Sequence, residues 1–249
     1  AGVLLPVFVE MFGWRGALVC AASMSLVFAL MLQPFRAEFD SDRQPHRSLK
    51  LTDLRATLGA VLRDARVREL ALGLFAFTGL QLAFASFFIS FLSLGMGWTL
   101  TDAGIAYSIA MGAGIAGRLI WGWVGSRYVP PVLLLAVLGL AMGVACMAIG
   151  LVDETWQKPA VWAVAFCYGM TGIGYQGVLL AEIARIAPPG MAGVVTGGAV
   201  FFAYVGMITF PGSFGIILAL TDSYQTAFVI LGALPIVVGA MLFVSARRQ

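Results

Sequence analysis

The chain has 249 residues, of which 61% are hydrophobic and 11% charged, and its mean hydropathy is +0.96. Soluble domains average about 45–50% apolar and about 25% charged residues, so this composition excludes a soluble globular fold. The formal net charge of +3 does not indicate nucleic-acid binding, because the basic residues are not gathered in one patch, and no nucleic-acid partner is expected.

Metal and cofactor sites are not expected either. Cys20, Cys146 and Cys167 each lie inside an apolar run, as small buried hydrophobic residues do, and His46 is the only histidine. Histidine-based zinc motifs and a phosphate-binding loop for ATP are therefore absent from the sequence.

The chain begins with an apolar run, residues 1–12, that is too short to span a bilayer and lacks the basic front and cleavage site of a signal peptide. We interpret this run as the end of a helix and the chain as a piece of a longer protein. A turn follows at residues 13–16, where Trp14 suits a membrane interface, and residues 17–32 form the first full apolar span.

Residues 33–68 are the only long polar stretch. Residues 36–48 carry many charges and a proline, which predicts a flexible segment. After Thr52, a residue that can cap a helix, leucines and a valine recur at helical spacing, and this pattern predicts a short amphipathic helix along the membrane surface.

Six further spans are predicted at about residues 69–94, 103–124, 131–151, 160–183, 192–220 and 225–244. Of the fifteen Lys and Arg residues, twelve fall on one side of these spans, Arg15 and Lys158 fall on the other, and Arg118 lies within a span. Because basic loops stay in the cytoplasm, the long loop and the C-terminus are predicted to be cytoplasmic. We therefore expect a multi-pass protein of the inner (plasma) membrane, surrounded by the lipid bilayer. The excess of arginine over lysine is typical of a GC-rich bacterial genome.

Four landmarks resemble those of the major facilitator superfamily in their order and spacing. They are the turn at residues 13–15, the long basic loop with its surface helix, the arginine-bearing helix end and loop at residues 117–127, and the acidic helix end, loop and glycine-faced helix marked by Glu182, Pro188, Gly190, Gly193 and Gly197. Two positions depart from the family pattern. Ser126 stands where the loop signature usually has an aspartate, and Phe210-Pro211 replaces a Gly-Pro pair.

The resemblance covers the whole chain and implies an all-α membrane protein. Residues 1–33 would end the N-terminal half as a partial helix five and helix six, residues 34–68 would link the two halves, and residues 69–249 would form the C-terminal six-helix bundle. The family implies a secondary active or facilitative transporter that moves a small solute by alternating access. It also implies a missing N-terminal half of the same protein as a partner of this chain.

Transporters of this class are expected to bind solute near the bilayer midplane, between two halves that rock. Polar and aromatic residues at helical spacing within the spans are the candidates to line that cavity. They are Gln81, Tyr107, Thr171, Tyr175, Gln176 and Tyr204. Such residues also serve simply as interhelical hydrogen-bonding groups, and that alternative stays open for each of them.

Arg118 is an arginine at membrane depth, a costly feature that by default marks a pathway, a gate or an ion pair. We expect a gate or structural ion pair with Glu182, which lies at a similar depth. Arg127 is the alternative partner of Glu182. Direct binding of an anionic solute by Arg118, or an arginine that only extends its charge to the membrane surface, are the remaining alternatives.

Glycines at close spacing predict close helix packing, because lipid offers no hydrophobic drive for helices to associate. The positions selected are Gly114, Gly117, Gly122, Gly172, Gly193 and Gly197.

The sequence indicates two possible classes of solute. One arginine at membrane depth favours a small organic anion, whereas the aromatic residues would suit efflux of amphipathic compounds. A non-transporting receptor or scaffold with the same body is the alternative from another class. A membrane-embedded enzyme is not expected, because Glu182 is the only acid well inside the last six spans.

Overall fold

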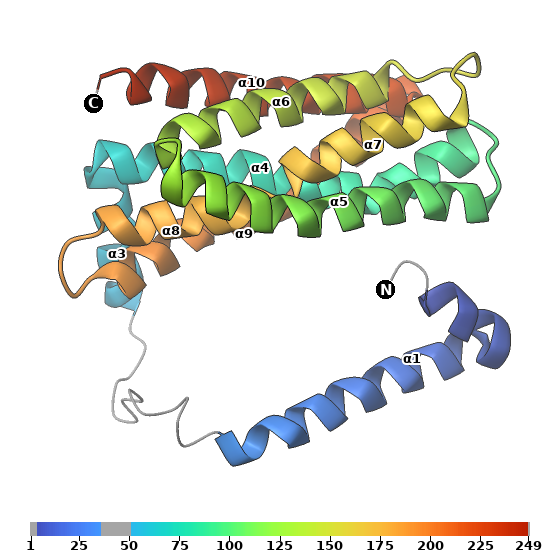
Figure 1. Cartoon of the computed structure of the whole chain (residues 1–249), viewed down its shortest axis with the longest axis horizontal. Helices are drawn as coiled ribbons and strands as arrows, with labels where there is room; N and C mark the ends of the chain where they lie inside the picture. The colour runs from blue at the N-terminus through green and yellow to red at the C-terminus, as the bar shows by residue number, and fades with distance from the viewer. Residues whose placement is uncertain (1–3, 36–50, 249) are drawn as a thin grey trace. The chain divides into compact units, whose positions relative to one another are not determined.

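The computed structural model describes residues 4–35 and 51–248, and every regular element within them is helical (Figure 1). In these residues seven stretches are long and apolar enough to cross a membrane, namely Gly13–Leu32, Ala65–Gly95, Leu100–Arg127, Pro131–Gly150, Lys158–Ile186, Ala192–Thr221 and Tyr224–Ala246. Each stretch overlaps one predicted span. The all-α membrane class is therefore confirmed.

The chain divides into two compact units, residues 1–51 and 52–249. The first contains α1 (Leu4–Leu32) and a short 3₁₀ turn, η1 (Gln33–Phe35). Gly13 interrupts α1 with φ of 67°, a left-handed conformation that only glycine adopts without strain. Of the turn predicted at residues 13–16, only Gly13 departs from helical geometry.

The remaining elements are α3 (Leu51–Arg63), α4 (Ala65–Ser90), the π-helical turn η2 (Phe91–Gly95), α5 (Leu100–Arg127), α6 (Pro131–Gly150), α7 (Lys158–Gly172), α8 (Gln176–Ile186), α9 (Ala192–Thr221) and α10 (Tyr224–Ala246). Polar side chains start several of them. Asp64 accepts hydrogen bonds from the first N–H groups of α4, and Thr99 does the same for α5. These caps satisfy donors that the start of a helix leaves unpaired.

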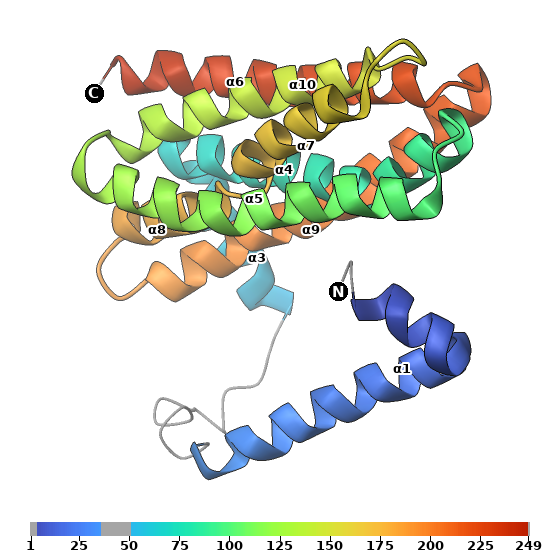
Figure 2. The same cartoon turned by 45° about the vertical axis from the view of Figure 1, so that its right-hand side comes forward.

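Helices of the second unit pack in pairs, α6 on α10, α4 on α9 and α5 on α7. Both views show α6 and α10 side by side (Figures 1 and 2). The pairs approach at backbone distance. A Cβ placed on Gly143 of α6 would lie 2.6 Å from the carbonyl oxygen of Gly232 of α10, and one on Gly79 of α4 would lie 2.9 Å from that of Gly206 of α9. Small residues thus determine which faces meet.

Three of the six glycines selected from the sequence lie at such contacts. A Cβ on Gly114 would meet the side chain of Ile173, and one on Gly117 would lie 2.6 Å from the carbonyl oxygen of Met170. Gly172 is similarly enclosed by neighbouring side chains. At these three positions a larger side chain would collide with neighbouring atoms.

Gly122, Gly193 and Gly197 make no such contact in the described residues, since a Cβ there would meet nothing within 4 Å, and their packing role stays a prediction. The contact near the start of α9 falls one residue later, at Gly198. There an added Cβ would lie 2.8 Å from Val61 of α3, a fully buried residue. Helical spacing alone could not decide between Gly197 and Gly198.

The span predicted as one helix at residues 160–183 is broken. Helix α7 ends at Gly172, α8 begins at Gln176, and Ile173 has a non-helical φ of −120°. On the assumption of an unbroken helix, the spacing of Tyr168, Thr171, Tyr175 and Glu182 predicts that all four share one face. That assumption is wrong, because the break changes the register between the two segments.

Candidate functional site

A hollow of about 280 Å³ lies between α4, α8 and α9. Its polar lining consists of Thr78 and Gln81 from α4, Gln176 from the start of α8, and Tyr204 from α9. The other lining side chains are apolar, and no Asp or Glu is among the lining residues in the described chain. A mostly apolar concavity with a few converging polar groups is the usual form of a small-molecule site.

Tyr175 lies behind the hollow and is fully buried. Its hydroxyl is 2.9 Å from Thr78 Oγ1 and donates to Gln81 Oε1 at 3.4 Å. The ring of Phe77 meets the Tyr175 ring edge-on, with 5.3 Å between centroids. Tyr175 therefore links the break before α8 to two polar residues of α4, and its buried hydroxyl is satisfied.

Arg118 of α5 binds the broken segment. Its Nε donates to the carbonyl oxygen of Ile173 at 3.3 Å, and its Nη2 donates to Gln176 Oε1, also at 3.3 Å. The break takes the carbonyl of Ile173 out of the regular helical ladder, where it would accept from the residue four positions later. Arg118 thus supplies a donor for this carbonyl and fixes the side chain of Gln176.

Trp121, one turn after Arg118, acts on the same break. Its indole Nε1 donates to the carbonyl oxygen of Met170 at 2.7 Å. The two helices meet closely at this level, since a Cβ on Gly117 would lie 3.2 Å from Gly174 Cα. A polar clamp from α5 and a tight glycine contact therefore hold the break in place.

Glu182 is bound by its own helix. Arg185 Nε donates to Glu182 Oε2 at 2.7 Å, and Arg185 Nη2 lies 2.6 Å from Oε1. The Glu182 side chain is 1% exposed and that of Arg185 is 64% exposed. This is a bidentate pair with one buried member, a geometry that favours arginine over lysine.

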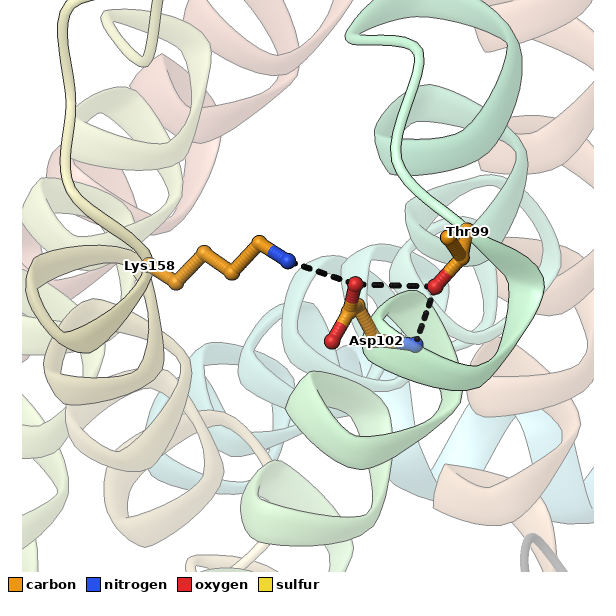
Figure 3. A network of polar contacts seen from close by, with 3 residues as sticks. All are labelled: Thr99, Asp102 and Lys158. Atoms are coloured by element: carbon orange, nitrogen blue, oxygen red, sulfur yellow. Dashed lines mark hydrogen bonds and ion pairs between the residues drawn. The ribbon is translucent and has the colours of Figure 1, made fainter.

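A second ion pair lies at the start of α5, far along that helix from Arg118. Lys158 Nζ is 2.6 Å from Asp102 Oδ2, and Thr99 both donates to that oxygen and accepts from the Asp102 N–H (Figure 3). The Lys158 ammonium also lies 5.6 Å from the ring centroid of Trp98. This cluster joins the first turns of α5 and α7.

A sequence model of the Major Facilitator Superfamily matches residues 1–211 of the chain. The chain belongs to this superfamily. A search of curated proteins found no match. This superfamily chain is accordingly a multi-pass protein of the transmembrane-transport class, and the family consists of transporters rather than enzymes.

The superfamily chain brings together four of the six residues predicted to line a cavity. Gln81, Gln176 and Tyr204 line the hollow, and Tyr175 lies directly behind it. Tyr107 and Thr171 do not border it. Tyr107 stacks on Phe84 with 6.1 Å between ring centroids, and Thr171 donates to the carbonyl of Cys167 in its own helix.

Neither predicted pairing of Glu182 is made in the described residues. Arg185, three positions along the same helix, occupies its carboxylate, while Arg118 is engaged at the break. Glu182 lies six residues beyond Gln176, or about 9 Å further along the helix. It is therefore too far from the residue that Arg118 contacts to share that arginine. The pairing with Arg127 is likewise absent, and Ser126 donates to the carbonyl of Trp123 in its own helix.

Two site residues were missed from the sequence. Arg185 carried a signal, because a basic residue three positions after an acid on a helix is a favourable pair. Trp121 carried none, since its role depends on a break that the apolar pattern does not reveal. No group of three or more His, Cys, Asp or Glu residues that could hold a metal occurs in the part of the chain the structure describes.

Proposed function

We propose that this chain is the larger part of a secondary active or facilitative transporter, which moves a small solute by alternating access across the inner membrane. The long loop and the C-terminus are cytoplasmic in this proposal, as the distribution of basic residues favours. An N-terminal half of the same protein completes the solute path. Membership of a family of transporters supports the general assignment.

The hollow between α4, α8 and α9 is the observation that carries the proposal. Gln81 lies near the middle of the span Ala65–Gly95, and Tyr204 lies near the middle of the span Ala192–Thr221. Solute sites of such transporters are built near the bilayer midplane, often beside interrupted helices. The break between α7 and α8 places Gln176 at the same hollow.

The apolar wall of the hollow favours a second solute class. Residues such as Leu82 and Met207 surround the polar groups, and this wall suits the apolar body of an amphipathic compound. Efflux of such compounds is therefore the alternative function. Both candidates use the same site and the same alternating access.

Alternating access is testable without knowing the solute. We place a single cysteine at Tyr204 in the full-length protein, with Cys20, Cys146 and Cys167 replaced by alanine, and label it with a membrane-impermeant maleimide. The measurement is the labelling rate in right-side-out and in inside-out vesicles. We expect Tyr204→Cys to react from both sides, because the site opens to each side in turn.

Two control variants define the sides. Gly190→Cys lies in the connection between α8 and α9, and Asp222→Cys lies between α9 and α10, at the opposite end of α9. Each should be labelled from one side only, and the two sides should differ. Labelling of Tyr204→Cys from a single side under all conditions contradicts alternating access at this hollow.

A further inference from the structure

The orientation of the Gln176 amide is fixed by its partner. Arg118 Nη2 lies 3.3 Å from Gln176 Oε1. A guanidinium only donates hydrogen bonds, so the group of Gln176 that faces it is the carbonyl oxygen. The amide nitrogen, with its two N–H donors, is therefore not used by Arg118 and is available to the hollow that Gln176 lines.

Gln81 is oriented in the same sense. The buried Tyr175 hydroxyl donates to Gln81 Oε1 at 3.4 Å, and Thr78 Oγ1 lies 2.9 Å from that hydroxyl. Because the phenol has one proton and gives it to Gln81, Thr78 donates to Tyr175. The carbonyl oxygen of Gln81 thereby faces Tyr175, and the N–H donors of Gln81 remain for the hollow.

The hollow consequently offers donors in excess of acceptors. Its free polar groups are the amide nitrogens of Gln81 and Gln176 and the hydroxyl of Tyr204, a residue that is 61% exposed. The lining residues of the described chain include no carboxylate. Donors that face a mostly apolar hollow are matched best by acceptor oxygens, so such a site favours a ligand rich in them.

We propose that the hollow binds a small organic anion, such as a carboxylate, through the amide N–H groups of Gln81 and Gln176, with Arg118 as the positioning residue that holds Gln176 in its donating orientation. This assignment rests on the proposed transport function and names its solute class. The apolar wall of Leu82 and Met207 receives the body of the anion.

Three probes with one ring and different head groups test the class: benzoate, benzamide and benzylamine. Binding to the full-length protein in detergent is measured by isothermal titration calorimetry at neutral pH. We expect benzoate to bind at least about tenfold more tightly than either other probe, as one hydrogen bond to a charged group provides. Equal or tighter binding of benzamide or benzylamine overturns the proposal, and so does a lack of benzoate binding. The cysteine-labelling result does not depend on these probes, so failure of the anion assignment and failure of alternating access are separate outcomes.

Gln176→Glu is the sharpest variant. The new carboxylate keeps an acceptor for Arg118 and almost the same shape, but it has no N–H for the solute. Benzoate affinity should fall about ten- to hundredfold while the thermal stability stays near that of the wild type. Gln225→Glu, the same chemical change in α10 away from the hollow, is the matched control and should leave affinity unchanged. Unaltered benzoate binding by Gln176→Glu refutes the role of its N–H groups.

The positioning role of Arg118 has its own readout. Arg118→Ala frees the Gln176 amide to turn, so the preference for benzoate over benzamide should fall several-fold, and Arg118→Lys should restore part of it. In a Gln176→Leu background the Arg118→Ala change should have little further effect on this preference, because Arg118 acts through Gln176. If Arg118→Ala lowers only thermal stability and leaves the preference intact, the residue is structural and the positioning role is wrong.

Discussion

Helix α5 is tied to the broken helix α7–α8 at two places that differ in kind. Near its start, Asp102 accepts from Lys158 at 2.6 Å, in an ion pair whose side chains are 24% and 49% exposed. Further along, Arg118 and Trp121 donate to main-chain carbonyls at the break, at 3.3 and 2.7 Å. The first tie joins two charges, and the second joins side chains to backbone.

A short distance between opposite charges is a poor guide to how much the ion pair stabilises the folded protein. An exposed ion pair has water as an alternative partner for each member, and its net contribution is small. The carbonyls of Met170 and Ile173 lie where the helix is broken, at part-buried contacts with α5. Losing a donor there leaves a polar group unsatisfied, which costs more than losing a favourable contact.

The largest effect should come from filling the space where α5 meets the break between α7 and α8, at Gly117. In Gly117→Ala the new Cβ would lie 2.6 Å from the Met170 carbonyl oxygen and 3.2 Å from Gly174 Cα, and both neighbours are backbone atoms that cannot rotate away. We expect a loss of about 3 kcal/mol in the free energy of unfolding, measured by SDS titration in mixed micelles. Gly122→Ala, on the same helix with nothing within 4 Å, should be neutral or slightly stabilising. Similar free energies of unfolding for the two variants would show that the close contact at Gly117 does not limit stability.

The Glu182–Arg185 pair is intermediate, because only one of its members is buried. Arg185→Ala should cost about 2 kcal/mol in unfolding free energy, since it leaves a buried carboxylate without its bidentate donor. Glu182→Gln should cost less, and the double variant should be milder than the sum of the single variants. Strictly additive losses in the same SDS titration would mean that the pair does not act as a unit.

Trp121→Phe removes the indole N–H from Met170 while keeping an aromatic ring. We expect a loss of about 1 kcal/mol, as for one hydrogen bond. We also expect faster amide hydrogen exchange at residues 173–177, because the break loses one of its two donors. Trp123→Phe is the control, since Trp123 is exposed on the same helix. Equal exchange at residues 173–177 in both variants would argue that Arg118 alone holds the break.

Most of the fold could be predicted from the sequence, because spans, loops and composition follow from the need to keep backbone polar groups satisfied in lipid. The interruption at Ile173 could not, since Gly172 and Gly174 are also what a tightly packed continuous helix would contain. The shared face of Tyr168 and Glu182 assumed a continuous helical register. The pairing of Arg118 with Glu182 was predicted from their similar depth, but Arg185 binds the Glu182 carboxylate and Arg118 donates at the break.

The candidate site was predictable to the extent that single residues on separate spans could be selected by depth. Gln81 and Tyr204 were selected in this way, and both line the hollow between α4, α8 and α9. Tyr107 and Thr171 met the same criterion but interact away from the hollow. Tyr107 stacks on Phe84, and Thr171 donates a hydrogen bond to the Cys167 carbonyl in its own helix. Depth and spacing do not reveal which partner a side chain will find, and that choice needs the packed structure.

The smallest effect should come from the ion pair between Asp102 and Lys158. Its removal tests the comparison of the two contacts most directly. Lys158→Met removes the charge but keeps a long chain beside Trp98, and the Thr99 cap of α5 does not depend on Lys158. We expect a loss below about 0.5 kcal/mol by SDS titration, and a smaller loss still at high salt, since salt screens the wild-type pair. Asp102→Asn should behave similarly, because an asparagine can still accept from Thr99. If Lys158→Met destabilises the protein as much as Trp121→Phe does, the exposed ion pair stabilises the contact of α5 with α7 as much as the donors at the break do. Solvent exposure then does not predict which of the two contacts contributes more to the free energy of unfolding.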